Sequence, residues 1–534
     1  MSSPSSLGPS IVIIGAGFGG IAAAIKLKRQ GVKSFTIFEK ASEVGGTWRD
    51  NTYPGCTSDI SVHFYSLSTD LNPDWDRTCA YQPSILAYLK TVVDKHGLAP
   101  HVIFNTKVIS AEWNSATQAY TVTTEDVASG SRSTRVANIV ISAQGALSVP
   151  KHPNILGLKD FRGQIMHTAT WDKAVDLRGK RVAVIGNGSS AAQTVSRIAY
   201  LDGIQLTQFV RTPNWMLPAM SVNITRPFHW AFRHIPFSTR SFRWVLFWVS
   251  EFYYLSIFKL HFMRKPLSML AKTFIQTYAP KEYLPLLLPQ FPVGCRRIVF
   301  EDRYLPALHL PNVSLRSGTE IASIVTDGII MQDDKKVAFD VIICATGFSA
   351  GGLQFLVRGV DSTLQEFYDK NGGPSAYLGS TVPGFPNLYQ LFGPNTATGY
   401  TSVVFTLETQ VDYMMQLIKP VLERKFLSFD VTPEANNRYN TKLQGMFKDS
   451  VFTFCGSWYR AGGSGKNVMV FPSTMILFWW WCRSVVWSDY QVIGPNGRQM
   501  KDVSTLGANS KLVAAAYTAV SCAVVALAYL ASQH

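Results

Sequence analysis

The stretch Ile11-Val-Ile-Ile-Gly15-Ala-Gly17-Phe-Gly19-Gly20 decides the fold of this chain. Its first four residues are apolar and β-branched, a run that is typical of a strand buried on both faces of a parallel sheet. The glycines follow at the spacing G-x-G-x-x-G and lead into a helix-forming run. Gly15 permits a tight turn, Gly17 lets the backbone approach a pyrophosphate, and Gly20 lets the helix pack closely on the strand. The stretch therefore predicts a Rossmann-type unit that binds a dinucleotide.

A second glycine turn begins at Gly186, after another buried strand at residues 181–185. Its spacing is G-x-G-x-x-A, again between a predicted strand and a predicted helix. The two units differ at the tip of their next strand, where the first carries Glu39 and the second carries Arg211. A carboxylate there hydrogen-bonds a ribose hydroxyl, whereas a guanidinium pairs with a 2′-phosphate. The two side chains therefore predict FAD in the first unit and NADPH in the second.

Size and composition exclude several classes of protein. At 534 residues the chain is too long for one hydrophobic core, and 47% hydrophobic residues exclude global disorder. The net charge of +15 suits the phosphates of two dinucleotides. No nucleic-acid module or arginine-rich run accompanies it, so nucleic-acid binding is not expected. The seven cysteines are scattered without a C-x-x-C pair, which argues against a disulfide scaffold and a zinc site and favours a reducing compartment.

Residues 217–290 interrupt the alternation of strands and helices. Within them the run Phe242–Phe258 is apolar and aromatic almost all round, with basic residues before and after it. This pattern predicts a helical insertion that covers a substrate pocket, although a basic aromatic helix also suits a membrane surface. The histidines of this region lack the spacing of metal ligands, so no metal site is expected.

The C-terminal tail differs from the rest of the chain. The stretch Leu512–Ser532 contains no charged residue and follows Lys511. About 20 apolar residues are enough for a helix that spans a bilayer. The tail therefore predicts a single-pass anchor at residues 508–534, with the catalytic body on the cytosolic side of a membrane such as the endoplasmic reticulum. The alternative is a small-residue helix packed on the protein, because alanine is abundant and only weakly apolar.

Between the two glycine turns lies Phe161-Arg-Gly163-Gln-Ile-Met-His167-Thr-Ala-Thr-Trp171-Asp172. Its spacing, F-x-G-x-x-x-H-x-x-x-W-D, resembles the fingerprint of the Baeyer–Villiger monooxygenases. Residues 45–59 and 294–297 resemble further motifs of this family, and the resemblance spans roughly residues 11–490 in the family's order. It implies an enzyme that uses FAD, NADPH and O₂ to insert one oxygen atom beside a ketone carbonyl, which gives an ester or a lactone.

The resemblance also implies roles for individual residues. Arg297 is the expected catalytic arginine, and Asp59 is expected to support it. Thr57 and Ser58 depart from the family's pattern, which leaves the substrate side less defined. The residues expected to bind FAD are Gly15, Gly17, Gly20, Glu39, Thr47, Trp48, Asp59, Tyr65 and Val108. The residues expected to bind NADPH are Gly186, Asn187, Gly188, Ser189, Ser190, Gln193, Arg211, Thr212 and Arg296.

The sequence thus predicts an α/β protein with two nested Rossmann-like dinucleotide-binding domains, a helical insertion and a C-terminal hydrophobic helix. The expected FAD-binding domain comprises residues 1–150 and 340–507. The expected NADPH-binding domain comprises residues 151–216 and 291–339, and the insertion comprises residues 217–290.

Other functions remain open at this point. A flavin monooxygenase that oxygenates nitrogen or sulfur shares both glycine turns, but its linker differs and an arginine like Arg297 is not expected in it. A non-catalytic, membrane-tethered flavoprotein would bind the cofactors without turnover. A disulfide reductase is disfavoured, because Cys56 has no second cysteine close to it in the sequence. The aromatic insertion favours a bulky apolar ketone of secondary metabolism, such as a polyketide, terpenoid or steroid, and the oligomeric state cannot be predicted.

Overall fold

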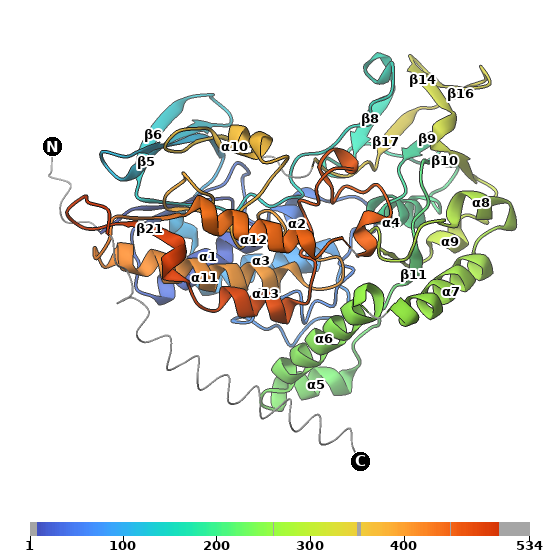
Figure 1. The fold of residues 1–534 in the computed structure, drawn as a ribbon. Coiled ribbons are helices and arrows are strands. Elements are labelled where there is room, and N and C mark those ends of the chain that lie inside the picture. Colours follow the sequence, from blue (N-terminus) through green and yellow to red (C-terminus); the bar gives the residue numbers. More distant parts are fainter. Residues whose placement is uncertain (1–7, 260, 350–353, 449, 501–534) are drawn as a thin grey trace.

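Two parallel sheets form the centre of the molecule in the computed structural model, which describes residues 8–259, 261–349, 354–448 and 450–500 (Figure 1). The first sheet contains the strand of the first glycine motif and confirms the predicted strand–turn–helix. Its strands are β1 (Ile11–Ile14), β2 (Phe35–Phe38), β3 (Val102–Ile103), β7 (Ile139–Ser142) and β19 (Leu388–Gln390). They pair in the order β19-β7-β1-β2-β3, and every pairing is parallel.

The second sheet contains the strand of the second glycine motif. Its strands are β8 (Gln164–His167), β9 (Arg181–Ile185), β10 (Gln205–Val210), β13 (Val313–Ser317) and β17 (Val341–Cys344). They pair in parallel in the order β13-β10-β9-β17-β8. The predicted return to the first unit at residue 340 is therefore too early, because β17 belongs to the second sheet. The sequence of a buried apolar strand does not indicate which of two parallel sheets the strand joins.

Smaller sheets and the helices surround these two sheets. A meander is formed by β4 (Thr106–Asn114), β5 (Ala119–Asp126) and β6 (Arg132–Ala137), to which β18 (Leu356–Arg358) adds. The other strands are β11 (Met216–Pro218), β12 (Val299–Glu301), β14 (Ile321–Val325), β15 (Gly328–Met331), β16 (Lys336–Ala338), β20 (Ser428–Val431) and β21 (Tyr490–Ile493). Besides the three insertion helices described below, the α-helices are α1 (Phe18–Arg29), α2 (Thr47–Asp50), α3 (Gln82–Lys95), α4 (Ser189–Ile198), α8 (Leu284–Leu287), α9 (Tyr304–Ala307), α10 (Leu364–Lys370), α11 (Val403–Leu422), α12 (Pro433–Gly445) and α13 (Met475–Cys482). Of these, α8 lies near the end of the insertion.

The glycine turns explain how the first helix of each unit approaches its sheet. A Cβ atom on Gly20 would lie 1.9 Å from the carbonyl oxygen of Gly15, so only glycine permits α1 to lie this close to the end of β1. In the second unit Gly186 has φ +137°, and a Cβ there would lie 2.3 Å from the carbonyl oxygen of Ala345. Both turns therefore require the glycine that the sequence supplies.

The predicted insertion is confirmed as helical, with α5 (Arg226–His234), α6 (Ser238–Tyr254), a π-helical turn η3 (Leu255–Lys259) and α7 (His261–Tyr278). In Figure 1 α5 and α6 project from the lower edge of the molecule. Two buried charged side chains anchor α6. Arg243 donates to the carbonyl oxygens of Phe64 and Ser66 at 2.9 and 2.7 Å, and to Glu408 on α11 at 3.1 Å. Glu251 accepts from the backbone N–H groups of residues 475 and 476 at the start of α13, at 3.0 and 3.3 Å.

A buried histidine beneath the insertion makes the stability of the fold depend on pH. His63 packs against Phe232 of α5 and Phe242 of α6, and burial lowers its pKa from 6.5 to about 4. The unfolded chain therefore binds a proton below pH 6.5 that the folded chain excludes until about pH 4. We expect the free energy of unfolding to fall by about 2 kcal/mol through this group between pH 7.5 and pH 5.

This prediction is checked by thermal or chemical unfolding at the two pH values. The variant His63→Phe should lose about 2 kcal/mol of the pH sensitivity, whereas replacement of the exposed His234 by Phe should keep all of it. Equal pH dependence in the wild type and His63→Phe would contradict the assignment.

The predicted membrane location is corrected by the fold. Among the described residues, no helix combines the length and the apolar composition that crossing a bilayer requires. The insertion helix α6, which sequence analysis also considered for a membrane surface, directs Arg243 and Glu251 into the protein. The tail stretch 512–532, on which the anchor prediction rested, lies outside the described residues. The membrane location is therefore not retained.

Candidate active site

The side chains of Arg297 and Asp59 form a two-pronged ion pair. Nη2 of Arg297 donates to both carboxylate oxygens of Asp59, at 2.8 and 2.7 Å, and Nε donates to Oδ2 at 3.0 Å. The negative charge of Asp59 raises the pKa of Arg297 above its ordinary value, so the guanidinium remains charged. The side chain of Arg297 is still 31% exposed. Asp59 holds one side of the Arg297 guanidinium, and the rest of the group is accessible. The guanidinium can therefore contact a bound molecule.

The loop that carries Asp59 packs on α4 of the second unit. Gly55 has φ +85°, and a Cβ there would lie 2.5 Å from the carbonyl oxygen of Gln193. The hydroxyl of Tyr53 donates to Oε1 of Gln193 at 2.8 Å, and Nε2 of Gln193 donates to the carbonyl oxygen of Thr57 at 3.2 Å. Gln193 was expected among the NADPH-binding residues, and it also joins the two units at this loop.

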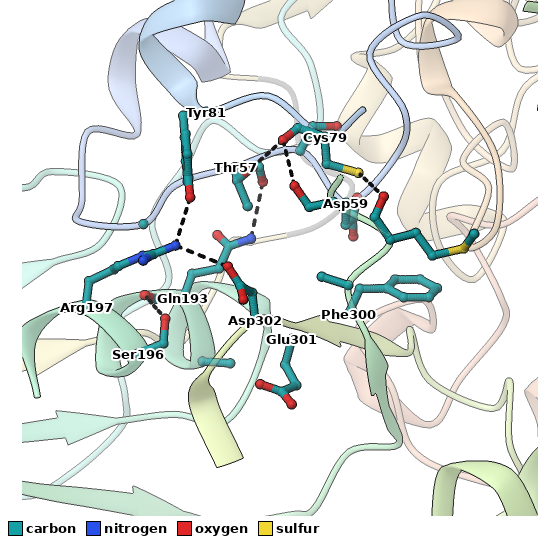
Figure 2. A pocket seen from close by; sticks show the side chains of 16 residues that line it. Thr57, Asp59, Cys79, Tyr81, Gln193, Ser196, Arg197, Phe300, Glu301 and Asp302 are labelled. Atoms are coloured by element: carbon teal, nitrogen blue, oxygen red, sulfur yellow. Dashed lines mark hydrogen bonds and ion pairs between the residues drawn. The ribbon is translucent and has the colours of Figure 1, made fainter. Parts of the chain in front are cut away.

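Figure 2 shows a pocket beside Asp59 at the junction of the two units. Gly55 and residues 57–59 line one side, and α4 lines another. Residues 219–221, which follow β11, and residues 300–302 at the end of β12 line the third side. Arg197 lines the pocket and donates to the hydroxyl of Tyr81 at 2.9 Å and to Asp302 at 3.3 Å. Asp59 therefore lies where both nucleotide-binding units meet.

The loop that carries Arg297 is fixed on two sides. Gly294 has φ +90°, and a Cβ there would lie 2.4 Å from Cγ2 of Ile257 in η3. On the other side Cys295 forms a disulfide bond with Cys455, 160 residues further along, with a Cα–Cα distance of 6.1 Å. Nε of Arg296 donates to the carbonyl oxygen of Gly456 at 2.8 Å. The scattered cysteines argued against a disulfide scaffold and did not indicate this single bond, because two cysteines far apart in the chain meet where two loops pack.

Loss of this disulfide should lower the stability of the protein. We expect Cys455→Ser to lower the free energy of unfolding by about 2–4 kcal/mol, because the bond closes a long loop in the unfolded chain. Chemical denaturation with and without dithiothreitol measures the effect, since the reductant should shift the wild type and leave Cys455→Ser unchanged. The variant Cys79→Ser, which removes a free thiol, is the control that keeps the response to the reductant. A reductant shift of the same size in Cys455→Ser would contradict the pairing.

Three tyrosines surround the ion pair, and sequence analysis identified only Tyr65. The hydroxyl of Tyr65 accepts a hydrogen bond from Nε1 of Trp48 at 3.3 Å. Burial raises the pKa values of Tyr65 and Tyr459 to about 12, and the charges of Arg297 and Asp59 act on both. Tyr253 of α6 is the third. Tyr253 stands in an apolar, aromatic run and Tyr459 in a stretch rich in glycine and serine, and neither pattern distinguishes a pocket residue from a core residue.

The first glycine turn fits a dinucleotide. No side chain caps the N-terminus of α1, so its first N–H groups are available to a pyrophosphate. Glu39 is buried beside this turn and accepts from the backbone N–H groups of Ala16 and Ala41, at 2.7 and 3.0 Å. Thr47 is exposed at the start of α2. Val108 is buried in β4 with Phe38 of the first sheet, behind the turn.

The second glycine turn fits a dinucleotide with an extra phosphate. Gly188 begins α4 without a side-chain cap, and a Cβ there would meet nothing within 4 Å. Ser189 and Ser190 form the first turn of this helix. Asn187 donates to the carbonyl oxygen of Thr212 at 3.3 Å, which holds the turn against the segment that follows β10. The positive charge of Arg211 reaches Arg296 and lowers its pKa, after the larger effect of burial. Within the described residues neither guanidinium is paired with a carboxylate, so together they suit an anion.

The linker motif lies along β8 and the turn that follows it. Gly163 is required, because a Cβ there would lie 2.5 Å from the carbonyl oxygen of Asp340 and 2.6 Å from the ring of Phe161. His167 is buried, and burial together with His152 lowers its pKa to about 4. Trp171 packs against the main core, and Asp172 accepts from the backbone N–H of residue 174 at 2.9 Å. The motif thus fixes the edge of the second sheet and makes no described contact with the ion pair.

Comparisons with known proteins give relatives over nearly the whole chain. A family described as pyridine nucleotide-disulphide oxidoreductase matches residues 12–225. A Baeyer-Villiger monooxygenase of Streptomyces coelicolor is 35% identical over 499 residues, which cover 92% of this chain and 94% of the relative. The crystal structure of a cyclohexanone monooxygenase from Rhodococcus sp. Phi1 bound to NADP⁺ is 26% identical, with a TM-score of 0.80 and coverage of 91% and 99% of the two chains. A crystal structure of OTEMO in complex with FAD and NADP is 25% identical, with a TM-score of 0.80 and coverage of 92% and 100%.

Proposed function

This chain belongs to the family of the Baeyer–Villiger monooxygenases, and on that premise we propose that it inserts one oxygen atom of O₂ beside the carbonyl group of a bulky apolar ketone. It is an FAD- and NADPH-dependent flavin monooxygenase, and the product of the proposed reaction is an ester or a lactone. The observation that carries the proposal is the ion pair of Arg297 and Asp59, which lies where the two nucleotide-binding units meet.

The residues present suit both cofactors. In this proposal the N-terminus of α1 and the glycines at 15, 17 and 20 hold the pyrophosphate of FAD, and Glu39 holds its ribose. The N-terminus of α4 holds the pyrophosphate of NADPH, and Arg211 and Arg296 hold its 2′-phosphate. When bound, the reduced flavin supplies the activated oxygen atom, and NADPH supplies the hydride that reduces it.

Arg297 acts on the charge that the reaction develops. Oxygen insertion beside a carbonyl passes through an arrangement in which oxygen atoms carry negative charge. A guanidinium that is already oriented by Asp59 stabilises this charge without reorganising during the reaction. The surrounding aromatic side chains exclude water and thereby strengthen the electrostatic interaction. Nη1 of Arg297, which does not bond Asp59, donates to the carbonyl oxygen of Thr398 at 3.5 Å. This contact limits the movement of the guanidinium.

The preference for a bulky apolar ketone is supported by the aromatic composition of the insertion, because pockets for apolar ligands are lined mainly by such side chains. Phe258 of η3 stacks on Phe452 with ring centroids 4.8 Å apart, and Tyr254 packs against Tyr400 at the same distance. These buried ring contacts fix the insertion to the rest of the protein.

The decisive experiment incubates purified holoenzyme with NADPH, O₂ and a panel of cyclic and linear ketones. We expect ketone-dependent NADPH consumption and products heavier than the ketone by one oxygen atom. Oxygenation of amines or sulfides with no ester from any ketone would favour the nitrogen- and sulfur-oxygenating class instead. NADPH oxidation that is independent of every added substrate would overturn the proposal.

A further inference from the structure

The hydroxyl group of Tyr253 is a buried polar atom without a partner. It makes no hydrogen bond within the described residues, although its oxygen is covered by protein and its ring is only partly buried. Nearly all buried polar side-chain atoms in folded proteins are hydrogen-bonded, since an unpaired one is costly. An unpaired donor near the ion pair suggests that a bound molecule accepts its hydrogen bond.

The position of Tyr253 on α6 directs it toward the ion pair. Ile257 follows about one helical turn later and touches Gly294 of the loop that carries Arg297. The charges of both Arg297 and Asp59 act on the hydroxyl of Tyr253. The π-helical turn η3 begins directly after α6, and such turns are frequent at functional sites.

The neighbouring tyrosine gives a matched contrast. Tyr254 is buried, and its hydroxyl donates to the carbonyl oxygen of Pro472 at 2.8 Å. Its polar atom is thus used within the protein, whereas that of Tyr253 is not. Both residues share one helix, which Arg243 and Glu251 fix to the rest of the protein. The two side chains therefore differ in whether the hydroxyl has a partner within the protein, and not in how firmly their helix is held.

We propose that the hydroxyl of Tyr253 donates a hydrogen bond to the carbonyl oxygen of the ketone, so that the insertion supplies a second donor to the group on which Arg297 acts. This inference rests on the proposed function. A carbonyl oxygen accepts two hydrogen bonds, and two fixed donors orient it and stabilise the charge that it gains. Burial raises the pKa of Tyr253 above its ordinary value, which keeps the hydroxyl protonated as a donor in neutral and mildly alkaline solution.

The proposal separates ketones from thioethers. A thioether sulfur is at most a weak acceptor, so it gains little from the hydroxyl. In Tyr253→Phe we expect kcat/KM for a cyclic ketone to fall by about 10- to 100-fold. Oxygenation of the matching cyclic thioether should change by less than about twofold. The rate at which NADPH reduces the flavin, measured without substrate, should stay at the wild-type value.

A binding measurement and a stability measurement accompany the kinetics. Titration of the resting holoenzyme with the ketone, followed by the flavin absorbance, should show weaker binding in Tyr253→Phe and wild-type binding in Tyr254→Phe. The thermal midpoint should stay constant or rise in Tyr253→Phe, because an unpaired polar atom is removed. It should fall in Tyr254→Phe, because the hydrogen bond to Pro472 is lost.

The outcomes are distinct. Loss of ketone and thioether turnover together, or no loss of either, would overturn the role of Tyr253 while the wild type still makes ester. A lower thermal midpoint in Tyr253→Phe would show that the hydroxyl is satisfied within the protein, by a trapped water for example, and would also overturn it. Tyr253→Leu provides a second variant without the hydroxyl and should repeat the selective loss on ketones. If the wild type forms no ester from any ketone, the proposed function itself is contradicted.

Discussion

Replacement of Arg297 by alanine is expected to lower the rate of ester formation by about a thousandfold or more. NADPH should still be oxidised, with hydrogen peroxide released in place of ester. The reason is that negative charge on the reacting oxygen atoms loses the cation that Asp59 holds in place at 2.7–3.0 Å. Mass spectrometry of the product and a peroxide assay in the same reaction measure the two effects together.

The adjacent arginine supplies the control. The charge of Arg211 acts on Arg296, whose Nε donates to the carbonyl oxygen of Gly456, so Arg296→Ala should raise the KM for NADPH by about tenfold. The yield of ester for each NADPH consumed should stay unchanged in this variant. Ester formation that survives in Arg297→Ala would exclude the ion pair as the reaction centre.

The second large effect is expected from Gly20→Ala, which should lower the free energy of unfolding by about 4 kcal/mol or more. Alanine normally stabilises a helix by about 1 kcal/mol over glycine. Here its Cβ would lie 1.9 Å from the carbonyl oxygen of Gly15, and neither backbone can move without separating α1 from the first sheet. We expect poor recovery of folded protein and no bound flavin, as judged by circular dichroism and absorbance.

Two other glycines distinguish a folding defect from a binding defect. A Cβ on Gly17 would lie 3.6 Å from the Cα of Gly46, an ordinary contact, and a Cβ on Gly188 would meet no protein atom within 4 Å. Gly17→Ala should therefore fold and lose affinity for FAD, and Gly188→Ala should fold and lose affinity for NADPH. A stable, flavin-containing Gly20→Ala protein would contradict the packing of α1 on β1.

The sequence predicted the features that depend on short-range patterns. The strand at residues 11–14, its glycine turn and its helix follow from ten consecutive letters, because a tight turn and a close helix leave few residue choices. The helical nature of residues 226–278 follows from their long apolar runs. The contact of Arg297 with Asp59 came from a resemblance between motifs, since the letters alone do not indicate which loops meet across 238 positions.

The features that the sequence did not predict depend on long-range packing. The bond between Cys295 and Cys455 joins loops that only the folded chain brings together. The membership of β17 in the second sheet is decided by its neighbours β9 and β8, and an apolar strand would suit either sheet. Tyr253 differs from Tyr254 only in what its hydroxyl reaches, which no periodicity reveals.

The amide of Gln193 constrains how the molecule can deform. It ties α4 to the backbone and to Tyr53 of the loop that leads to Asp59. Any rigid rotation of one half against the other that preserves these two bonds must pivot close to that amide. A substitution at Gln193 therefore acts on α4 and on the loop that leads to Asp59 at the same time.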